Sequence, residues 1–278
     1  MIFSKLAAPL AAILAVATAQ RPATPQSTEV IDGIKFIKSG PRVLLPKDEY
    51  ELKFARDALN RLKTRLGPDG LLDLLQPDIQ EADAFWHDII DKSSSSLYVS
   101  ADGRVIGFFP NMTALDFAAW SQSPLADKAN NAANPEHYFK RTEEVSPGVL
   151  RAEILEGWGG VTTHFTVPDY TTPPDKEKHG MLRELPEFPI QAAGSKVLAD
   201  GTDAVFGVLH ISVRDVPGEE HGEEQDGIEV YASVWYGDAI DDDHLEAERQ
   251  HIVVEIINMS MQAQKDIENG DFKPPTAQ

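Results

Sequence analysis

Two stretches in the second half of the chain carry side chains that are able to bind and transform a small molecule. In an extended strand, every second side chain points to the same face, so each stretch would present one polar face. If the two stretches pair in a sheet, these faces form a single polar patch with aromatic edges. The patch consists of His210, Ser212 and Arg214 from the first stretch and Glu229, Tyr231, Ser233 and Trp235 from the second.

The residue types in this patch suit acid–base chemistry. Arg214 would bind a carboxylate or enolate oxygen, and His210 or Glu229 would transfer a proton, so these three are the candidate catalytic residues. The two aromatic rings would stack on the ligand, and together with the two serines they form the candidate ligand-binding set. The alternative is that the patch is the solvated side of an antiparallel sheet, with Arg214 and Glu229 as a cross-strand ion pair.

A second candidate binding segment surrounds Trp158, which stands among glycines at positions 157, 159 and 160. Glycine inside a strand pattern permits a bend or a close approach of the backbone. His164 alternates with two threonines and would face a polar side. Trp158 and His164 are therefore candidate ligand-binding residues at the mouth of a pocket. The same pattern is also typical of a bend in a sheet followed by a surface histidine.

The sequence carries none of the short motifs that identify a common enzyme class. It has no GxSxG nucleophile elbow, HExxH zinc helix, P-loop or GxGxxG fingerprint, and it contains no cysteine. Segment 215–248 contains thirteen acidic residues and no lysine or arginine, which would suit Ca²⁺ but equally a solvated loop and an acidic helix start. We therefore predict neither a cofactor nor a metal site, and the sequence leaves open whether the protein is an enzyme.

Helices are predicted where apolar residues recur at a spacing of three and four. The clearest is the last, over 242–269, which Gly270 follows in the position of a C-terminal cap. Its polar stripe, which includes His244, His251 and Asn258, is predicted to face solvent opposite the apolar face. The other predicted helices are 50–66, a segment opened by Pro77, and about 113–120.

Strands are predicted where apolar and polar residues alternate, and Asp102-Gly103 predicts a hairpin turn between two of them. Residues 168–189 contain five prolines and predict a long loop. The predicted strands are 30–37, 97–100, 104–109, 137–144, 149–156, 161–167, 196–198, 205–214 and 228–236.

This order of elements resembles the helix-grip architecture of START-like and Bet v1-like proteins. There, a curved antiparallel sheet wraps a C-terminal helix and leaves an apolar cavity between them. The resemblance concerns element order and no sequence motif. We predict an α+β fold in which a largely antiparallel curved sheet packs on a long C-terminal amphipathic helix, with an N-terminal helical layer.

The N-terminus predicts secretion. A lysine at position 5, an apolar run over 6–16 and Ala17-Thr18-Ala19 form the three zones of a signal peptide over residues 1–19. Residues 20–46 are predicted to be an extended lead segment, and residues 47–278 a single α+β domain. Asn111 and Asn258 stand in N-x-S/T sequons and are the candidate glycosylation sites.

Charge and composition restrict the partners. A net charge of −20 makes nucleic acid an unsuitable partner, since phosphate binding depends on a basic surface, and it also disfavours anionic membranes after signal cleavage. The predicted partner is a small apolar or aromatic molecule bound between sheet and helix, with or without cofactor-independent turnover of the cyclase, dehydratase or isomerase type. The alternative is a secreted acidic interaction protein without catalytic activity. The sequence does not indicate the oligomeric state.

Overall fold

The computed structural model describes residues 26–39, 45–146 and 149–274, which belong to two compact units, Met1–Ala55 and Arg56–Gln278. The first unit contains the hairpin of β1 (Gln26–Ile31) and β2 (Ile34–Ser39), where one strand was predicted. Asp32 and Gly33 both have positive φ at its turn, which reverses the chain. The predicted signal peptide lies outside the described residues.

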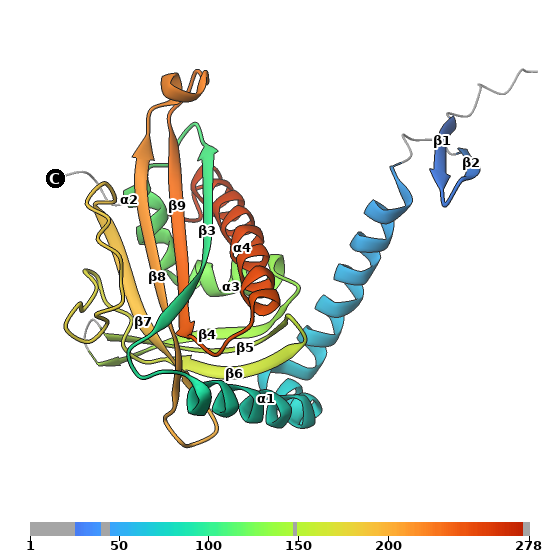
Figure 1. Cartoon of the computed structure of the whole chain (residues 1–278). Helices are drawn as coiled ribbons and strands as arrows, with labels where there is room; N and C mark the ends of the chain where they lie inside the picture. The colour runs from blue at the N-terminus through green and yellow to red at the C-terminus, as the bar shows by residue number, and fades with distance from the viewer. Residues whose placement is uncertain (1–25, 40–44, 147–148, 275–278) are drawn as a thin grey trace, which may run out of the picture. The chain divides into compact units, whose positions relative to one another are not determined.

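The second unit is built on a seven-stranded antiparallel sheet with the order β3-β9-β8-β7-β6-β5-β4. The sheet curves around the C-terminal helix α4 (Asp242–Glu268), as Figure 1 shows. This is the predicted helix-grip arrangement of the α+β class. The strands are β3 (Tyr98–Phe108), β4 (His137–Ser146), β5 (Val149–Trp158), β6 (Val161–Val167), β7 (Ile190–Leu198), β8 (Val205–Val216) and β9 (Gly227–Gly237).

The predicted hairpin at Asp102-Gly103 is wrong, because β3 runs straight through both residues and pairs with β9 along its whole length. Gly103 serves a different purpose. A Cβ atom on this residue would lie 2.2 Å from Cγ2 of Ile252 on α4. The glycine therefore lets the helix approach the strand closely, a role that the sequence does not distinguish from a turn.

We expect Gly103→Ala to lower the free energy of unfolding by about 1–3 kcal/mol, because the added methyl group overpacks the contact between β3 and α4. Urea denaturation would measure the loss. Ile252→Ala removes the closest atom, Cγ2, but leaves Cβ 2.9 Å from the added methyl group. The double variant should therefore lose less stability than the sum of the two single variants. If Gly103→Ala folds with unchanged stability, the close approach of α4 is not a constraint.

Two short helices connect β3 to β4. The first, α2 (Ala114–Ser121), was predicted and begins with a capping box between Thr113 and Asp116. The second, α3 (Pro124–Ala133), was not predicted, since its sequence is rich in Ala and Asn and has little apolar pattern. Together with α4 they lie on the concave side of the sheet (Figure 1).

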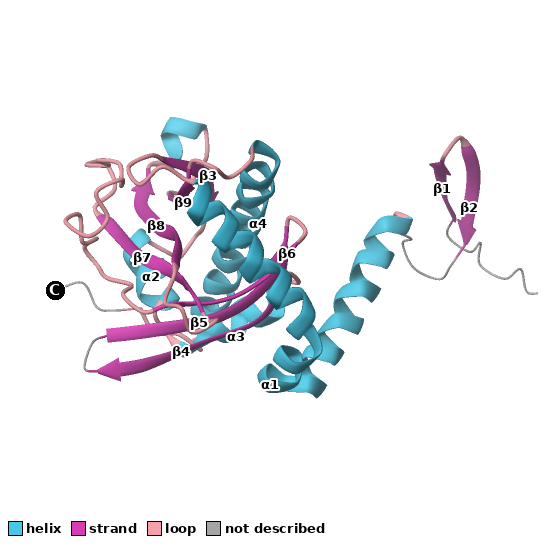
Figure 2. Cartoon of the chain, turned by 60° about the horizontal axis from the view of Figure 1, so that its bottom comes forward, coloured by secondary structure: helices cyan, strands magenta, loops and turns pink. Residues whose placement is uncertain are grey.

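The helix α1 (Lys47–Lys92) is interrupted at Gly67, whose φ of 65° and ψ of 177° are not helical. The predicted end of the first helix at this glycine is confirmed. The helix resumes directly after it, so the predicted start at Pro77 is wrong. Figure 2 shows α1 crossing near β6, where Trp86 Nε1 donates to Thr163 Oγ1 at 2.9 Å. Among the described residues, no helix is both long and apolar enough to cross a bilayer.

Candidate functional site

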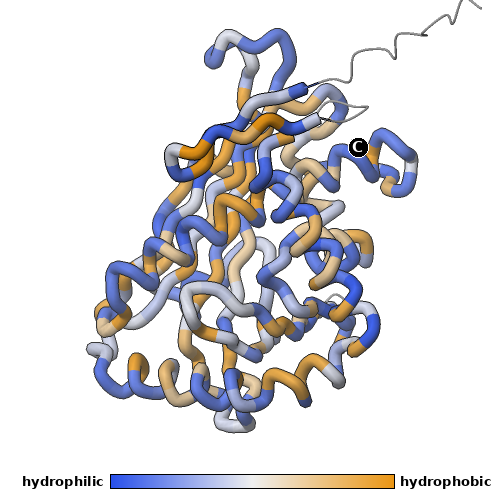
Figure 3. The backbone as a smooth tube through the Cα atoms, turned by 90° about the vertical axis from the view of Figure 1, so that its right-hand side faces the viewer, coloured by the Kyte–Doolittle hydropathy of each residue, from blue (hydrophilic) through white to orange (hydrophobic). Residues whose placement is uncertain are grey.

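The two faces of β8 and β9 have different neighbours. Hydrophobic and hydrophilic residues alternate along the strands (Figure 3), and the pleat separates them. Ile211 pairs directly with Ala232, and both face a cavity between the sheet and α4. The neighbouring pairs His210↔Ser233 and Ser212↔Tyr231 therefore point to the opposite, convex face.

The predicted patch exists, but it lies on this convex face. Both Arg104 and Arg214 form ion pairs with Glu229, whose side chain is 1% exposed. The cross-strand pair between Arg214 and Glu229 matches the structural alternative that the sequence left open. The prediction that the patch lines the sheet–helix cavity is wrong, because the apolar face of the sheet turns toward α4. The patch residues on this face are His210, Ser212, Arg214, Glu229, Tyr231, Ser233 and Trp235.

The predicted long loop, residues 168–189, supplies side chains that cover the patch. Arg183 donates to Asp102 and to the Tyr231 hydroxyl, each at 2.6 Å, and its guanidinium lies 4.8 Å from the Trp235 ring centroid. His210 is buried and contacts Gln191 Oε1 at 3.0 Å. Burial and nearby positive charges lower the pKa of His210 to about 4. The loop thus covers the convex face, and two of its residues, Tyr170 and Thr172, also line the cavity.

The structure separates the other two predicted ligand-binding residues. His164 points to the outer face of β6, where its Nε2 lies 3.0 Å from Glu153 Oε1. Trp158 stacks on His251 of α4 with ring centroids 5.2 Å apart. Trp158 therefore lies near the buried end of the cavity described below, whereas the sequence predicts it at the mouth.

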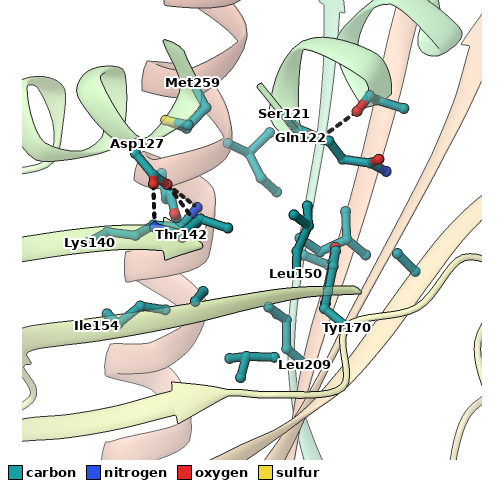
Figure 4. A pocket seen from close by; sticks show the side chains of 18 of the residues that line it. Ser121, Gln122, Asp127, Lys140, Thr142, Leu150, Ile154, Tyr170, Leu209 and Met259 are labelled. Carbon is teal, nitrogen blue, oxygen red and sulfur yellow. Dashed lines mark hydrogen bonds and ion pairs between the residues drawn. The ribbon is translucent and has the colours of Figure 1, made fainter. Parts of the chain in front are cut away.

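The cavity has a volume of about 490 Å³ and lies between the concave face of the sheet and the helices α2, α3 and α4. A cavity of this volume is large enough for a drug-sized or smaller molecule. Figure 4 shows Leu150, Ile154 and Leu209 on its walls. The remaining apolar walls include Phe165, Val167, Ile211, Val213, Val230, Ala232, Val234, Ile252, Ile256 and Met259.

One end of the cavity is polar and partly exposed. Asp127 of α3 accepts from the backbone nitrogen of Thr142 at 2.6 Å and lies 3.6 Å from the ammonium of Lys140 (Figure 4). Ser121 and Gln122, at the end of α2, are exposed and also line the cavity. These residues form the rim, so a ligand would enter here.

The opposite end holds a buried ion pair. Lys196 Nζ lies 3.4 Å from Glu156 Oε1, and the two residues are only 5% and 4% exposed. Four aromatic rings surround the ammonium at centroid distances of 4.6 to 5.9 Å, which is the range of cation–π contacts. These rings belong to Trp158, Phe165, Phe206 and Tyr236.

Two histidines stand beside this pair. His137 Nε2 lies 3.4 Å from Glu156 Oε2, and His251 Nε2 lies 3.9 Å from the same oxygen. On its other side, His251 Nδ1 lies 3.3 Å from Glu136 Oε1. The cavity therefore ends in a group of buried and half-buried ionisable side chains, which we call the inner cluster. Its members are Glu136, His137, Glu156, Lys196, Glu248, His251 and Glu255.

Burial and mutual charge shift the pKa values of the inner cluster. Burial would raise the pKa of Glu156, but Lys196 and the two neighbouring histidines together outweigh burial and lower this pKa to about 2. Burial lowers the pKa of His137. It would also lower that of His251, but the carboxylates of Glu136 and Glu156 raise it to about 9. Burial raises the pKa of Glu248, which accepts from the Tyr236 hydroxyl at 2.7 Å.

The directions of these shifts give the cluster a candidate proton acceptor and a candidate proton donor. Glu156 is ionised, whereas His137 is neutral and can accept a proton. Glu248 holds its proton more strongly than an exposed carboxyl and can donate it. Perturbed groups that converge on one end of an apolar cavity are typical of a binding or catalytic site.

Sequence reasoning missed this cluster. The prediction that His244 and His251 face solvent is wrong, since they are 5% and 9% exposed. At 3.6 residues per turn, the two histidines are rotated by about 110° from the apolar stripe, and the curved sheet contacts both sides of the helix, through Trp158 at His244 and Gly103 at Ile252. Asn258 is also less exposed than predicted, because its Nδ2 donates to Ala133 O and Asn134 Oδ1 at 3.1 and 2.9 Å.

His244 offers a test of the packing beside the inner cluster. It lies among aromatic rings, its Nε2 has no hydrogen-bond partner among the described residues, and burial lowers its pKa to about 4. We expect His244→Phe to raise the free energy of unfolding at pH 7 by about 1 kcal/mol, because an unpaired polar atom is removed.

The same variant should resist acid better. An unfolded histidine gains its proton below about pH 6.5 and the folded His244 only near 4, so His244 costs the wild type stability as the pH falls through this window. Urea denaturation at pH 7 and pH 5 should show a smaller pH difference for His244→Phe, by about 1–2 kcal/mol. An unchanged difference would show that His244 does not titrate this way.

Comparison with known proteins supplies similar structures only. No protein-family model matches the sequence, and no curated protein matches it. Norcoclaurine synthase from Thalictrum flavum, in complex with dopamine and hydroxybenzaldehyde, is similar at 13% identity over 64% of this chain and 90% of that chain, with a TM-score of 0.38. The Zhui aromatase/cyclase from a Streptomyces species is similar at 13% identity over 62% and 96%, with a TM-score of 0.38. The di-domain StfQ from the steffimycin biosynthetic pathway is similar at 10% identity over 88% and 69%, also at 0.38. These values carry no conclusion about function.

Proposed function

We propose that this protein binds a small, mostly apolar molecule in the cavity between the sheet and α4. One observation carries the proposal: a cavity of about 490 Å³ has apolar walls, an exposed polar rim and a buried ionic end. An apolar body would fill the middle, where burial stabilises it. A polar group on the ligand would meet Lys196 or Glu156, because leaving that group unpaired would weaken binding.

The inner cluster also supports turnover by acid–base chemistry, which is the second part of the proposal. In this scheme His137 accepts a proton from the bound molecule and Glu248 supplies one, while Lys196 stabilises negative charge on a ligand oxygen. Proton transfer of this kind serves cyclisation, dehydration or isomerisation. It needs no redox partner, since the protons return to the same molecule or to water.

Native mass spectrometry of protein purified from its own source tests binding directly. We expect an adduct of constant mass that is retained under mild desolvation and lost under harsh activation. An adduct-free spectrum, together with no binding of the neutral fluorescent probe N-phenyl-1-naphthylamine, would contradict the proposal. It would favour the alternative of an interaction protein that acts through its acidic surface.

Comparing variants then separates a binder from an enzyme. Once the ligand is known, Glu248→Gln should retain affinity in either case, because the shape of the side chain is kept. If the protein is an enzyme, this variant should lose turnover by about 100-fold or more. Turnover that survives both Glu248→Gln and His137→Gln would contradict the acid–base assignment.

Secretion is a further part of the proposal and rests on the signal-like sequence over residues 1–19. In a secreted protein both sequons could be glycosylated, but their surroundings predict opposite outcomes. Asn111 is exposed in a turn after β3, whereas the side-chain amide of Asn258 is engaged in two hydrogen bonds. We expect a glycan on Asn111 and none on Asn258.

Expression in a secretory eukaryotic host tests this expectation. Intact mass before and after glycosidase treatment should show one glycan, and Asn111→Gln should abolish the difference. Residues 1–19 should be missing from the secreted product. A glycan on Asn258 would contradict the expected difference between the two sequons. Retention of residues 1–19 would contradict the predicted signal peptide.

A further inference from the structure

Three side chains of the inner cluster converge in a way that their own contacts do not explain. Glu136, His137 and His251 each offer one ligand atom, and these atoms lie within 4.8 Å of one another. Both ring nitrogens of His137, Nδ1 of His251 and Oε1 of Glu136 are buried without a hydrogen-bond partner in the described part of the chain. His251 Nδ1 and Glu136 Oε1 lie 3.3 Å apart as an ion pair, whereas Nδ1 of His137 has no such partner among the described residues.

Unpaired imidazole nitrogens are costly at this depth. His137 is 3% exposed, and a buried polar atom left without a hydrogen-bond partner costs about 1–3 kcal/mol. A cation that accepted the three lone pairs would remove this cost. Two imidazoles and one carboxylate are the ligand set used for Zn²⁺ in catalytic sites and for Fe²⁺ in facial triads.

The surroundings also resemble those of a metal site. Metal-binding histidines usually direct their second nitrogen to a carboxylate, which fixes the ring. His137 Nε2 lies 3.4 Å from Glu156, and His251 Nε2 lies 3.9 Å from Glu156 and 3.8 Å from Glu255. This arrangement leaves Nδ1 of each ring for the metal.

The charges around the two histidines also favour a bound cation. Near the two histidines, the carboxylates of Glu136, Glu156 and Glu255 face the ammonium of Lys196 and, without a metal, the protonated ring of His251. A divalent cation that displaced the proton from His251 would still be attracted by the three carboxylates. His137, Glu156, His251 and Glu255 all line the cavity, so such an ion would have access to a bound molecule.

We propose that Glu136, His137 and His251 bind one divalent transition-metal ion at the inner end of the cavity, with a coordination position left for water or ligand. The inference goes beyond the proposed function and does not require it; with a metal bound, His137 would be a ligand, so its role as proton acceptor would apply to the metal-free protein alone. It is an alternative to the prediction that the protein has no metal site. A metal here would act as a Lewis acid on a polar group of the bound molecule.

The test uses the purified chain and the metal alone. After EDTA treatment and removal of the chelator, titration with ZnCl₂ in a calorimeter should show one equivalent bound at about micromolar affinity or tighter. Titration with CoCl₂ should give the visible absorption of four- or five-coordinate Co²⁺ with nitrogen ligands. Neither readout depends on knowing the organic ligand or on activity.

Variants then assign the ligands. His137→Gln and His251→Gln should each weaken Zn²⁺ binding by about 100-fold or more, since a three-ligand site would lose one ligand. His164→Gln is the matched control, because His164 also lies 3.0 Å from a glutamate oxygen but on the outer face of β6. It should bind Zn²⁺ as the wild type does.

Two results would overturn the proposal. One is wild-type protein that binds neither Zn²⁺ nor Co²⁺ stoichiometrically. The other is a control variant that loses as much affinity as the two ligand variants. If the ligand variants fail to fold by circular dichroism, the Co²⁺ spectrum of the wild type decides the matter. Naphthylamine binding measured with EDTA tests the cavity separately, so failure of the metal site and failure of the binding proposal are distinguishable.

Discussion

Replacing Ile211 by tryptophan should reduce the affinity for a small apolar molecule by about 100-fold or more. Ile211 stands in the middle of the concave face, in a row with Ala192 on β7 and Ala232 on β9, and all three line the cavity. An indole at this position would occupy the space that a ligand needs. The isoleucine is only half-buried because its free surface faces the cavity, so the larger ring can be accommodated without unfolding.

N-phenyl-1-naphthylamine fluorescence provides the measurement, and the adjacent residue provides the control. Ser212 is fully buried but points to the convex face, so Ser212→Ala should leave probe binding unchanged. Urea denaturation of both variants would exclude unfolding as the cause. If Ser212→Ala weakened the probe as much as Ile211→Trp, the ligand would bind on the convex face and the cavity assignment would be wrong.

This pair of variants tests which face of the sheet binds the ligand, and this is the point that the sequence analysis predicted wrongly. Alternation along 205–214 and 228–236 correctly predicted two strands with one polar and one apolar face each. The site was then placed on the polar face, because that face holds the recognisable chemistry. A sheet buries its apolar face against a helix, and α4 was already predicted, so the apolar face should have been directed to the cavity.

Other features could not be obtained from the sequence. Glu156, Lys196 and His251 come from β5, β7 and α4, and no local pattern marks residues that meet only through tertiary pairing. Lys196 follows a run of small residues, and this pattern is typical of the exposed end of a short strand. Its burial depends on α1, which brings Trp86 against Phe206 and Tyr236 at this end of the sheet.

The last prediction concerns the buried ion pair of Lys196 and Glu156. We expect Lys196→Met to lower the free energy of unfolding by about 3–5 kcal/mol, measured in EDTA so that no metal contributes. The methionine fills similar space, so the loss would come from the carboxylate of Glu156, which is 4% exposed and would keep no ammonium partner. In contrast, Lys92→Met should cost less than about 1 kcal/mol, because Lys92 and Asp88 form an exposed pair on α1.

A double variant shows whether the loss reflects an uncompensated charge. Replacing both partners, with Lys196→Met and Glu156→Leu, removes the charge along with its partner and should recover most of the stability. If the double variant is as unstable as the sum of the two single variants, the pair is not coupled and the charges are stabilised by their other neighbours. The double variant could also regain stability but lose binding of the probe or ligand. This result would show that the buried pair contributes to ligand binding, because apolar side chains would stabilise the fold equally well.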